Sequence, residues 1–117
     1  ARIKVSSPLG RLTQTHQTLA DGNTRIRNFG NISETLEEGE SPTEAAQRGL
    51  YEELGLAIAL DRLQVTGKSD EIKPSPSTGQ LKAYRFWDFA LEISIEEAEK
   101  VPPSVQEGDV RTHFTWG

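Results

Sequence analysis

Segment 41–55 is the strongest local signal in the sequence, because both ends of a helix are specified there. Ser41 is a favourable N-cap, Pro42 fits the first helical position, and Glu44 completes a capping box with Ser41. Gly55 follows as the residue that ends the helix, because glycine accepts a left-handed backbone conformation without steric penalty. The sequence therefore predicts a helix from Pro42 to about Leu54.

The predicted helix separates apolar from charged side chains. At about 100° per residue, one stripe carries Ala46, Leu50 and Leu54. An adjacent face carries Gly49, Glu52 and Glu53. We therefore expect the stripe to pack on a core and the carboxylates to point away from it.

Strand signals fill most of the remaining sequence. Alternating polarity and β-branched or aromatic residues indicate strands, and the loop residues Gly, Pro, Asn and Ser separate them. Residues 21–23 (DGN) have the chemistry of a hairpin turn, so the segments on either side are expected to pair antiparallel. The expected strands are 2–7, 11–20, 24–32, 61–72, 81–93 and 109–116, with a short helix at 94–101 and a loop at 73–80.

The chain has 117 residues, enough for one compact domain with a single core. Strands, one long helix and then further strands favour an α/β fold in which helices cover a mixed sheet. Such domains usually place a second helix on the other face of the sheet, and none is evident before Gly117. We therefore expect a single domain over residues 1–117 and leave open a truncation at its C-terminus.

Charge and composition exclude several classes of function. The 13 basic and 18 acidic residues give a net charge of -5, the wrong sign for holding nucleic acid through its phosphates alone. The absence of cysteine excludes disulfides, thiol catalysis and cysteine-based zinc sites, and it is compatible with the cytoplasmic location that we expect. No apolar run approaches the ~20 residues of a membrane span, so we expect no membrane association.

Seven residues in segment 34–56 stand at fixed spacings, and they are Glu40, Arg48, Leu50, Glu52, Glu53, Gly55 and Leu56. They match seven of the nine fixed positions of the pattern GX5EX7REUXEEXGU, in which U is a bulky aliphatic residue. The segment therefore resembles the Nudix box, and such a match in register is rare by chance. The resemblance implies a Nudix-like α/β/α sandwich with a mixed β-sheet, in which segment 42–54 is the main helix.

The resemblance also implies a function. Nudix hydrolases cleave a pyrophosphate linkage, usually in a nucleoside diphosphate joined to another group, with Mg²⁺ or Mn²⁺. Divalent cations offset the charge of the diphosphate and orient or acidify the attacking water. The expected partner is accordingly a small-molecule diphosphate, with no membrane or nucleic acid, and a homodimer is left open.

Roles for individual residues follow from the same resemblance. Glu53 is expected to be the main metal ligand with assistance from Glu52, since Mg²⁺ needs only one or two protein carboxylates. Both are candidate catalytic residues, together with Arg48. Glu40, Arg48 and Gly55 are expected to have structural roles, in which Arg48 pairs with Glu40 and holds the preceding loop against the helix.

Two positions depart from the box pattern. Glu34 stands where the first glycine belongs, and Gly49 stands where the first glutamate of the core REUXEE belongs. Glycine inside a helix is unfavourable by about 1 kcal/mol relative to alanine, so Gly49 requires a cause such as close packing. Without that glutamate the catalytic base would come from outside the box, and the candidates are Asp70, Glu71, Glu107 and Asp109.

The departures keep an alternative function open, a catalytically weakened or inactive Nudix-fold module that binds ligands or serves as a scaffold. Isomerisation of an isoprenoid diphosphate, known in proteins sharing this fold, relies on a cysteine that this chain lacks.

His16 and His113 receive no role. The aromatic residues of segment 81–93 are expected to be mostly core, with one ring available to stack on a substrate.

Overall fold

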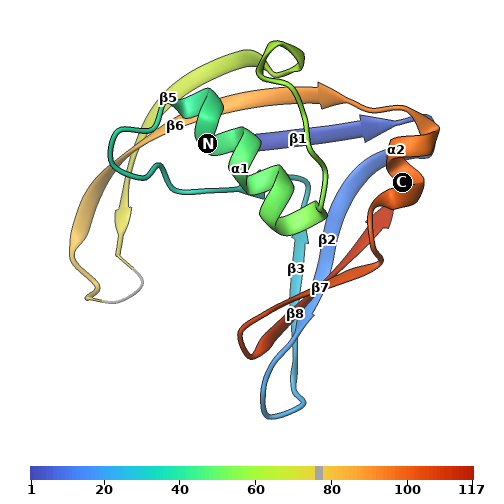
Figure 1. Cartoon of the computed structure of the whole chain (residues 1–117). Coiled ribbons are helices and arrows are strands. Elements are labelled where there is room, and N and C mark those ends of the chain that lie inside the picture. Colours follow the sequence, from blue (N-terminus) through green and yellow to red (C-terminus); the bar gives the residue numbers. More distant parts are fainter. Residues whose placement is uncertain (76–77) are drawn as a thin grey trace.

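The computed structural model describes residues 1–75 and 78–117 (Figure 1). The strands are β1 (Arg2–Ser7), β2 (Gly10–Thr18), β3 (Thr24–Phe29), β4 (Ile32–Ser33), β5 (Gln64–Pro74), β6 (Leu81–Glu92), β7 (Ser104–Glu107) and β8 (Val110–Trp116). The helices are α1 (Pro42–Leu54) and α2 (Ile95–Lys100), with a short 3-10 helix at Leu60–Arg62.

The eight strands within the described residues form one mixed sheet in the order β5-β6-β1-β2-β8-β7. β1 pairs with β6 in parallel, whereas the other pairings are antiparallel. β3 pairs with β2 through the predicted hairpin, and β4 pairs with β1. The expected α/β class with a mixed sheet is confirmed.

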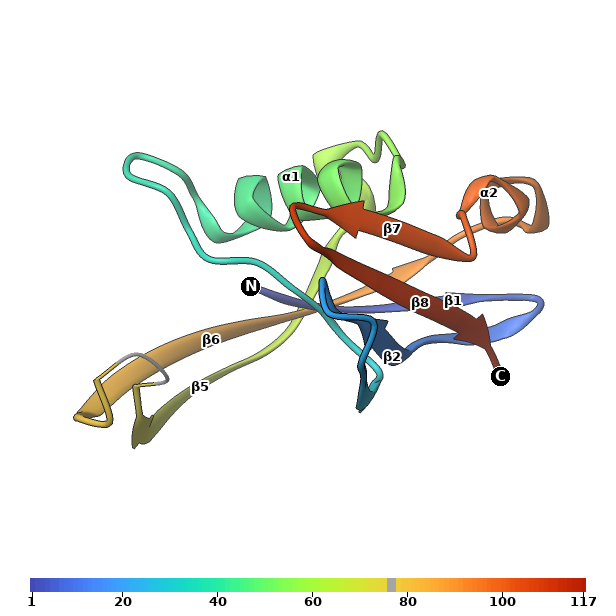
Figure 2. The same ribbon diagram turned by 90° about the horizontal axis from the view of Figure 1, so that it is seen from below.

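The sheet has two long extensions, which Figures 1 and 2 show on either side of α1. One is the β5–β6 ribbon, paired from Gln64 opposite Ala90 to Pro74 opposite Leu81. The other is the arm formed by β2, β3, β7 and β8. The space between these extensions is where the candidate site lies.

Several predicted boundaries need correction. Segment 61–72 does not begin as a strand, because Leu60–Arg62 forms a 3-10 turn, and β5 then continues to Pro74. Segment 24–32 is divided into β3 and β4, and β7 was not expected. Of the predicted loop 73–80, residues 76–77 lie outside the described residues.

Helix α1 forms where its local signals predict. The Ser41 hydroxyl accepts a hydrogen bond from the Glu44 N–H at 3.1 Å, and the Glu44 carboxylate accepts one from the Ser41 N–H at 3.0 Å. Gly55 ends the helix in the left-handed region with φ 71°. No helix within residues 1–75 and 78–117 has the length and apolar character needed to cross a membrane.

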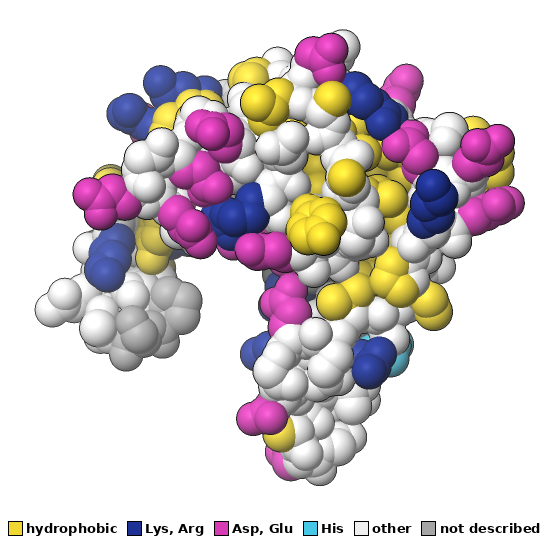
Figure 3. All heavy atoms as spheres, in the orientation of Figure 1, with side chains coloured by type: hydrophobic (Ala, Val, Ile, Leu, Met, Phe, Trp, Pro, Cys, Tyr) yellow, Lys and Arg dark blue, Asp and Glu magenta, His cyan; other side chains and the backbone are white. Residues whose placement is uncertain are grey.

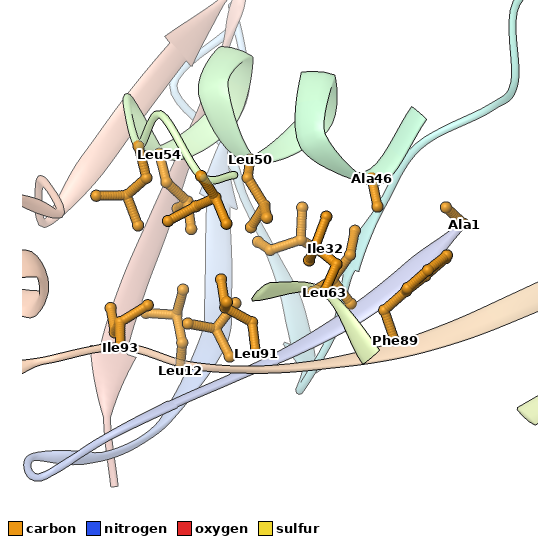
Figure 4. Packing of buried hydrophobic residues seen from close by; sticks show 14 of the residues in the cluster. Ala1, Leu12, Ile32, Ala46, Leu50, Leu54, Leu63, Phe89, Leu91 and Ile93 are labelled. Atoms are coloured by element: carbon orange, nitrogen blue, oxygen red, sulfur yellow. The ribbon is translucent and has the colours of Figure 1, made fainter. Parts of the chain in front are cut away.

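The core lies between the helices and the sheet (Figure 4). Its most deeply buried large side chains are Phe89, Ile3, Leu50, Leu54, Leu91 and Val5. Ala46 completes the predicted apolar stripe of α1, and Ala98 of α2 joins the same cluster. Both helices therefore pack on one core, which fixes α1 against β1 and β6.

Replacing Ser41 with alanine is expected to lower the free energy of unfolding by about 1 kcal/mol, because the N–H of Glu44 loses its capping acceptor. Urea denaturation followed by circular dichroism measures the change. Ser41→Asp is the matched control, since aspartate also caps helices and should retain most of the stability. Equal stability of all three proteins would contradict this role for the capping box.

Candidate active site

A cleft opens beside the C-terminal half of α1, and Figure 3 shows the recess between the β5–β6 ribbon and the β2–β3–β7–β8 arm. This open cleft has a volume of about 530 Å³ and is walled by α1, the segment after β4, and parts of β1, β5, β6 and β7. A smaller inner hollow of about 190 Å³ lies against β2, β3 and β8. Ser33, Glu53 and Glu107 belong to both walls, so the two spaces adjoin there.

Glu53 is half-buried at this junction. Burial raises the pKa of its carboxyl group to about 8, and repulsion from Glu107 and then Glu34 adds to the rise. Attraction to Arg27 acts in the opposite direction, and Glu52 contributes a further rise. The negative charge around Glu53 thus exceeds what Arg27 offsets, and a bound divalent cation would relieve this excess.

Arg48 holds the loop before α1 against the helix. Its guanidinium donates to both carboxylate oxygens of Glu40, at 2.9 and 3.0 Å, and to the carbonyl oxygen of Thr35 at 2.7 Å. The hydrogen bonds from Arg48, together with one from the Glu37 N–H, lower the pKa of Glu40 to about 2, and the pairing with Glu40 raises the pKa of Arg48. The turn in this loop is made by Gly39, whose φ of 79° favours glycine.

Arg48 also contacts carboxylates beyond Glu40. Its Nη1 atom lies 3.2 Å from Glu34 Oε1, 3.3 Å from Glu52 Oε2 and 3.6 Å from Glu37 Oε1. Glu52 is exposed and lines neither the open cleft nor the inner hollow. Of the two neighbouring glutamates, Glu53 is therefore the one that the helix places in the cleft.

The two departures from the box pattern, Glu34 and Gly49, lie against each other. Gly49 is buried in α1, and a Cβ atom added to it would lie 3.0 Å from Glu34 Cβ, 3.3 Å from Glu34 Cγ and 3.4 Å from Glu34 Oε2. The close packing that a mid-helix glycine requires is therefore provided by the Glu34 side chain. Glu34 lines the open cleft together with Glu53.

The structure separates the four candidate bases. Glu107, at the end of β7, shares both walls with Glu53 and influences its charge state. Asp70 forms an ion pair with Arg85 at 2.9 Å, and Glu71 lies 3.7 Å from Arg2. Asp109 is exposed in the turn between β7 and β8. Glu107 is thus the candidate that the fold brings to Glu53.

The opposite wall of the open cleft carries cations and aromatic rings. The guanidinium carbon of Arg2 lies 4.2 Å from the centroid of the Phe86 ring. Lys73 Nζ lies 4.7 Å from the Phe86 centroid and 5.3 Å from that of Tyr84. The Arg2 Nε donates to Asp88 Oδ1 at 2.7 Å, and this bond raises the pKa of Arg2. The cleft therefore has carboxylates on one side, and on the other side ring faces beside two basic groups, which are paired with Asp88 and Glu71.

A family model described as the NUDIX domain matches residues 11–116. The chain belongs to the Nudix family. A comparison with curated proteins found no match. Family membership supports a Nudix-type hydrolase that acts on a small-molecule substrate, and Nudix domains generally use divalent metal ions.

The Nudix box residues lie in different parts of the structure. Glu53 lines the cleft, whereas Glu52 is exposed beside Arg48. Arg48 and Glu40 join the loop to α1. Gly55 ends the helix, and its N–H bonds to the carbonyl oxygen of Tyr51 at 2.9 Å.

Sequence reasoning missed several residues of the cleft. It treated Glu34 only as a departure from the Nudix pattern, and it gave Arg2 and Lys73 no role. Tyr84 and Phe86 line the cleft rather than the core, whereas Phe89 is only 1% exposed, as expected for a core residue. The sequence contained one signal for a role of Glu34. Relative to the Nudix pattern, glutamate replaces glycine at position 34 and glycine replaces glutamate at position 49.

The residues at the cleft fit a divalent cation. Glu34, Glu53 and Glu107 offer oxygen donors of the type that Mg²⁺ prefers. Burial, followed by repulsion from Glu107 and Glu34, raises the pKa of Glu53. Within residues 1–75 and 78–117, no three such side chains already converge in ligand geometry. This is compatible with Mg²⁺, which commonly binds one or two carboxylates and fills its other positions with water and substrate phosphates.

Proposed function

We propose that this Nudix domain hydrolyses a pyrophosphate linkage in a nucleoside diphosphate-type small molecule with the help of Mg²⁺ or Mn²⁺. The observation that carries the proposal is the place of Glu53, half-buried where the open cleft meets the inner hollow. An acidic group whose pKa is raised to about 8 in a cleft is typical of a functional site.

Glu53 is proposed to be the main ligand of the cation, and Glu52, which is exposed and paired with Arg48, is proposed to assist. The bound ion supplies positive charge that offsets the negative charge of the diphosphate and of the transition state. Arg48, through Glu40 and the carbonyl of Thr35, holds the loop that completes this side of the cleft. Arg48 is therefore proposed to act by positioning this loop.

Glu107 is proposed to accept a proton from the attacking water. The water oxygen forms a bond to one phosphorus, the bond between that phosphorus and the bridging oxygen breaks, and the second phosphate leaves with the bridging oxygen. Glu107 lines both spaces beside Glu53, so it can reach a water held there. Neither Asp70 nor Asp109 lines them.

The cationic and aromatic wall supports the substrate class. Arg2 and Lys73 can attract the phosphates of an anionic substrate into a cleft whose other side is acidic. Tyr84 and Phe86 provide ring faces beside these cations, suited to an aromatic group such as a nucleobase. The wall therefore complements both parts of a nucleotide.

A substrate panel tests this function. We expect repeated turnover of at least one nucleoside diphosphate linked to a sugar, a second nucleoside or a further phosphate, and we expect turnover to stop when EDTA removes the metal. Chromatography of the products, with and without Mg²⁺ or Mn²⁺, measures it. Binding without turnover of any compound would instead support the alternative, a Nudix-fold module that has lost catalysis.

A further inference from the structure

The contact between Glu34 and Gly49 joins the only two positions at which segment 34–56 departs from the fixed positions of the Nudix pattern. The exchange is reciprocal, because glutamate stands in the loop where glycine is expected and glycine stands in the helix where glutamate is expected. The added Cβ distances of 3.0 to 3.4 Å show that a side chain at position 49 would press directly on Glu34. The absence of a side chain at position 49 therefore leaves the space that the Glu34 side chain occupies.

The Glu34 carboxylate reaches the face of α1 that carries Glu53. Gly49 precedes Glu53 by one helical turn, so these two positions are neighbours on the helix surface. Glu34 Oε2 lies 3.4 Å from the point that the Cβ of residue 49 would occupy. Glu34 and Glu53 both line the open cleft.

The backbone of Glu34 is fixed by the sheet. Its N–H bonds to the carbonyl oxygen of Ala1 at 2.9 Å, and its own carbonyl oxygen accepts a bond from the Ala1 amino group at 2.8 Å. These bonds continue the pairing of β1 with β4. The side chain therefore extends toward α1 from a rigid position.

We propose that Glu34 supplies, from the segment after β4, the carboxylate that α1 lacks at position 49, and that Glu34 joins Glu53 in holding the divalent cation. The inference rests on the proposed function, since it assigns a second ligand at the same site. Gly49 is then the residue that makes room for this ligand, which accounts for a mid-helix glycine that is unfavourable by about 1 kcal/mol.

The ion pair with Arg48 does not account for Glu34 by itself. Arg48 already makes two hydrogen bonds to Glu40 and one to Thr35, each at 3.0 Å or less. Glu34 reaches it at 3.2 Å through Oε1, whereas Oε2 lies over Gly49. The Glu34 Cβ and Cγ atoms occupy the space that a side chain at position 49 would need, and the second carboxylate oxygen, which does not reach Arg48, is carried with them onto this face of α1.

Titration of the metal-free full chain with Mn²⁺, followed by electron paramagnetic resonance, tests the inference without an activity assay. Glu34→Gln should weaken Mn²⁺ binding by about tenfold or more, because the number of charged ligands sets the affinity of such sites. Glu38→Gln is the matched control, since Glu38 is exposed in the same loop and makes the same change in net charge. This control should bind Mn²⁺ like the wild type.

A variant in which the residues at positions 34 and 49 are exchanged provides a more stringent test. Glu34→Gly should bind Mn²⁺ weakly, and Glu34→Gly combined with Gly49→Glu should recover most of the lost affinity. If Glu34→Gln lowers the melting temperature but leaves Mn²⁺ affinity unchanged, Glu34 is only a structural partner of Arg48 and the inference is wrong. The proposed function would still stand if Glu53→Gln abolished Mn²⁺ binding, whereas a wild type that binds no Mn²⁺ would overturn both.

Discussion

Replacing Glu53 with glutamine is expected to lower kcat for Mg²⁺-dependent hydrolysis by about 10³-fold or more. Glutamine keeps the size of the side chain but removes the charge where the open cleft meets the inner hollow. Losing about 4 kcal/mol of charge stabilisation in the transition state corresponds to three powers of ten in rate. Steady-state kinetics on the best compound of the substrate panel measures the change.

Two further variants test whether the loss of kcat is specific to position 53. Glu99→Gln, on the exposed surface of α2, alters the net charge equally and should leave kcat within about twofold of the wild type, as expected for a surface change. Glu52→Gln should cause a smaller loss than Glu53→Gln, because Glu52 is exposed and paired with Arg48. Full activity of Glu53→Gln would exclude the proposed mechanism.

The fold was most predictable where short-range signals decide it. The ends of α1 depend on Ser41, Glu44 and Gly55, which interact with residues within five positions of themselves, so their pattern can be read directly from the sequence. The strand β7 was missed because it has only four residues and forms through its pairing with β8. Such pairing is decided by the tertiary structure, which local patterns do not contain.

The candidate site shows the same limit. The box spacing places Glu53 on the helix and Arg48 within reach of Glu40, and both relations are visible in one segment. The contributions of Glu107 and Phe86 depend on which strands fold over α1, so no local spacing indicates them. Glu34 is an intermediate case. The replacement of the pattern residues at positions 34 and 49 is visible in the sequence, but only the structure shows that the two residues are in contact.

The Glu53→Gln substitution is also expected to stabilise the metal-free protein at alkaline pH. Folding raises the pKa of the Glu53 carboxyl from 4.5 to about 8, first through burial and then through repulsion by Glu107 and Glu34. Between these pH values the unfolded chain has released the proton while the folded chain still binds it. The free energy of unfolding therefore falls as the pH rises through this window, by at most about 1.4 kcal/mol for each pH unit.

Glutamine cannot ionise, so the variant escapes this loss. Urea unfolding in EDTA should give similar free energies for both proteins at about pH 4.5 and a more stable variant at about pH 8.5. The difference between the two proteins isolates Glu53, because groups such as Glu40 and Glu97, whose pKa values are lowered to about 2, are common to both. Equal stability at the higher pH would show that Glu53 is not in a crowded acidic environment.

Adding Mg²⁺ at the higher pH connects stability to function. A ligand that binds only the folded state adds about 2.7 kcal/mol when its concentration is 100 times its dissociation constant. The wild type should gain this stabilisation because the ion offsets the repulsion among Glu53, Glu107 and Glu34. Glu53→Gln should gain little, so Mg²⁺ narrows or reverses the difference seen in EDTA. Equal gains by both proteins would place the ion elsewhere, and Glu53 would then destabilise the fold without serving as its ligand.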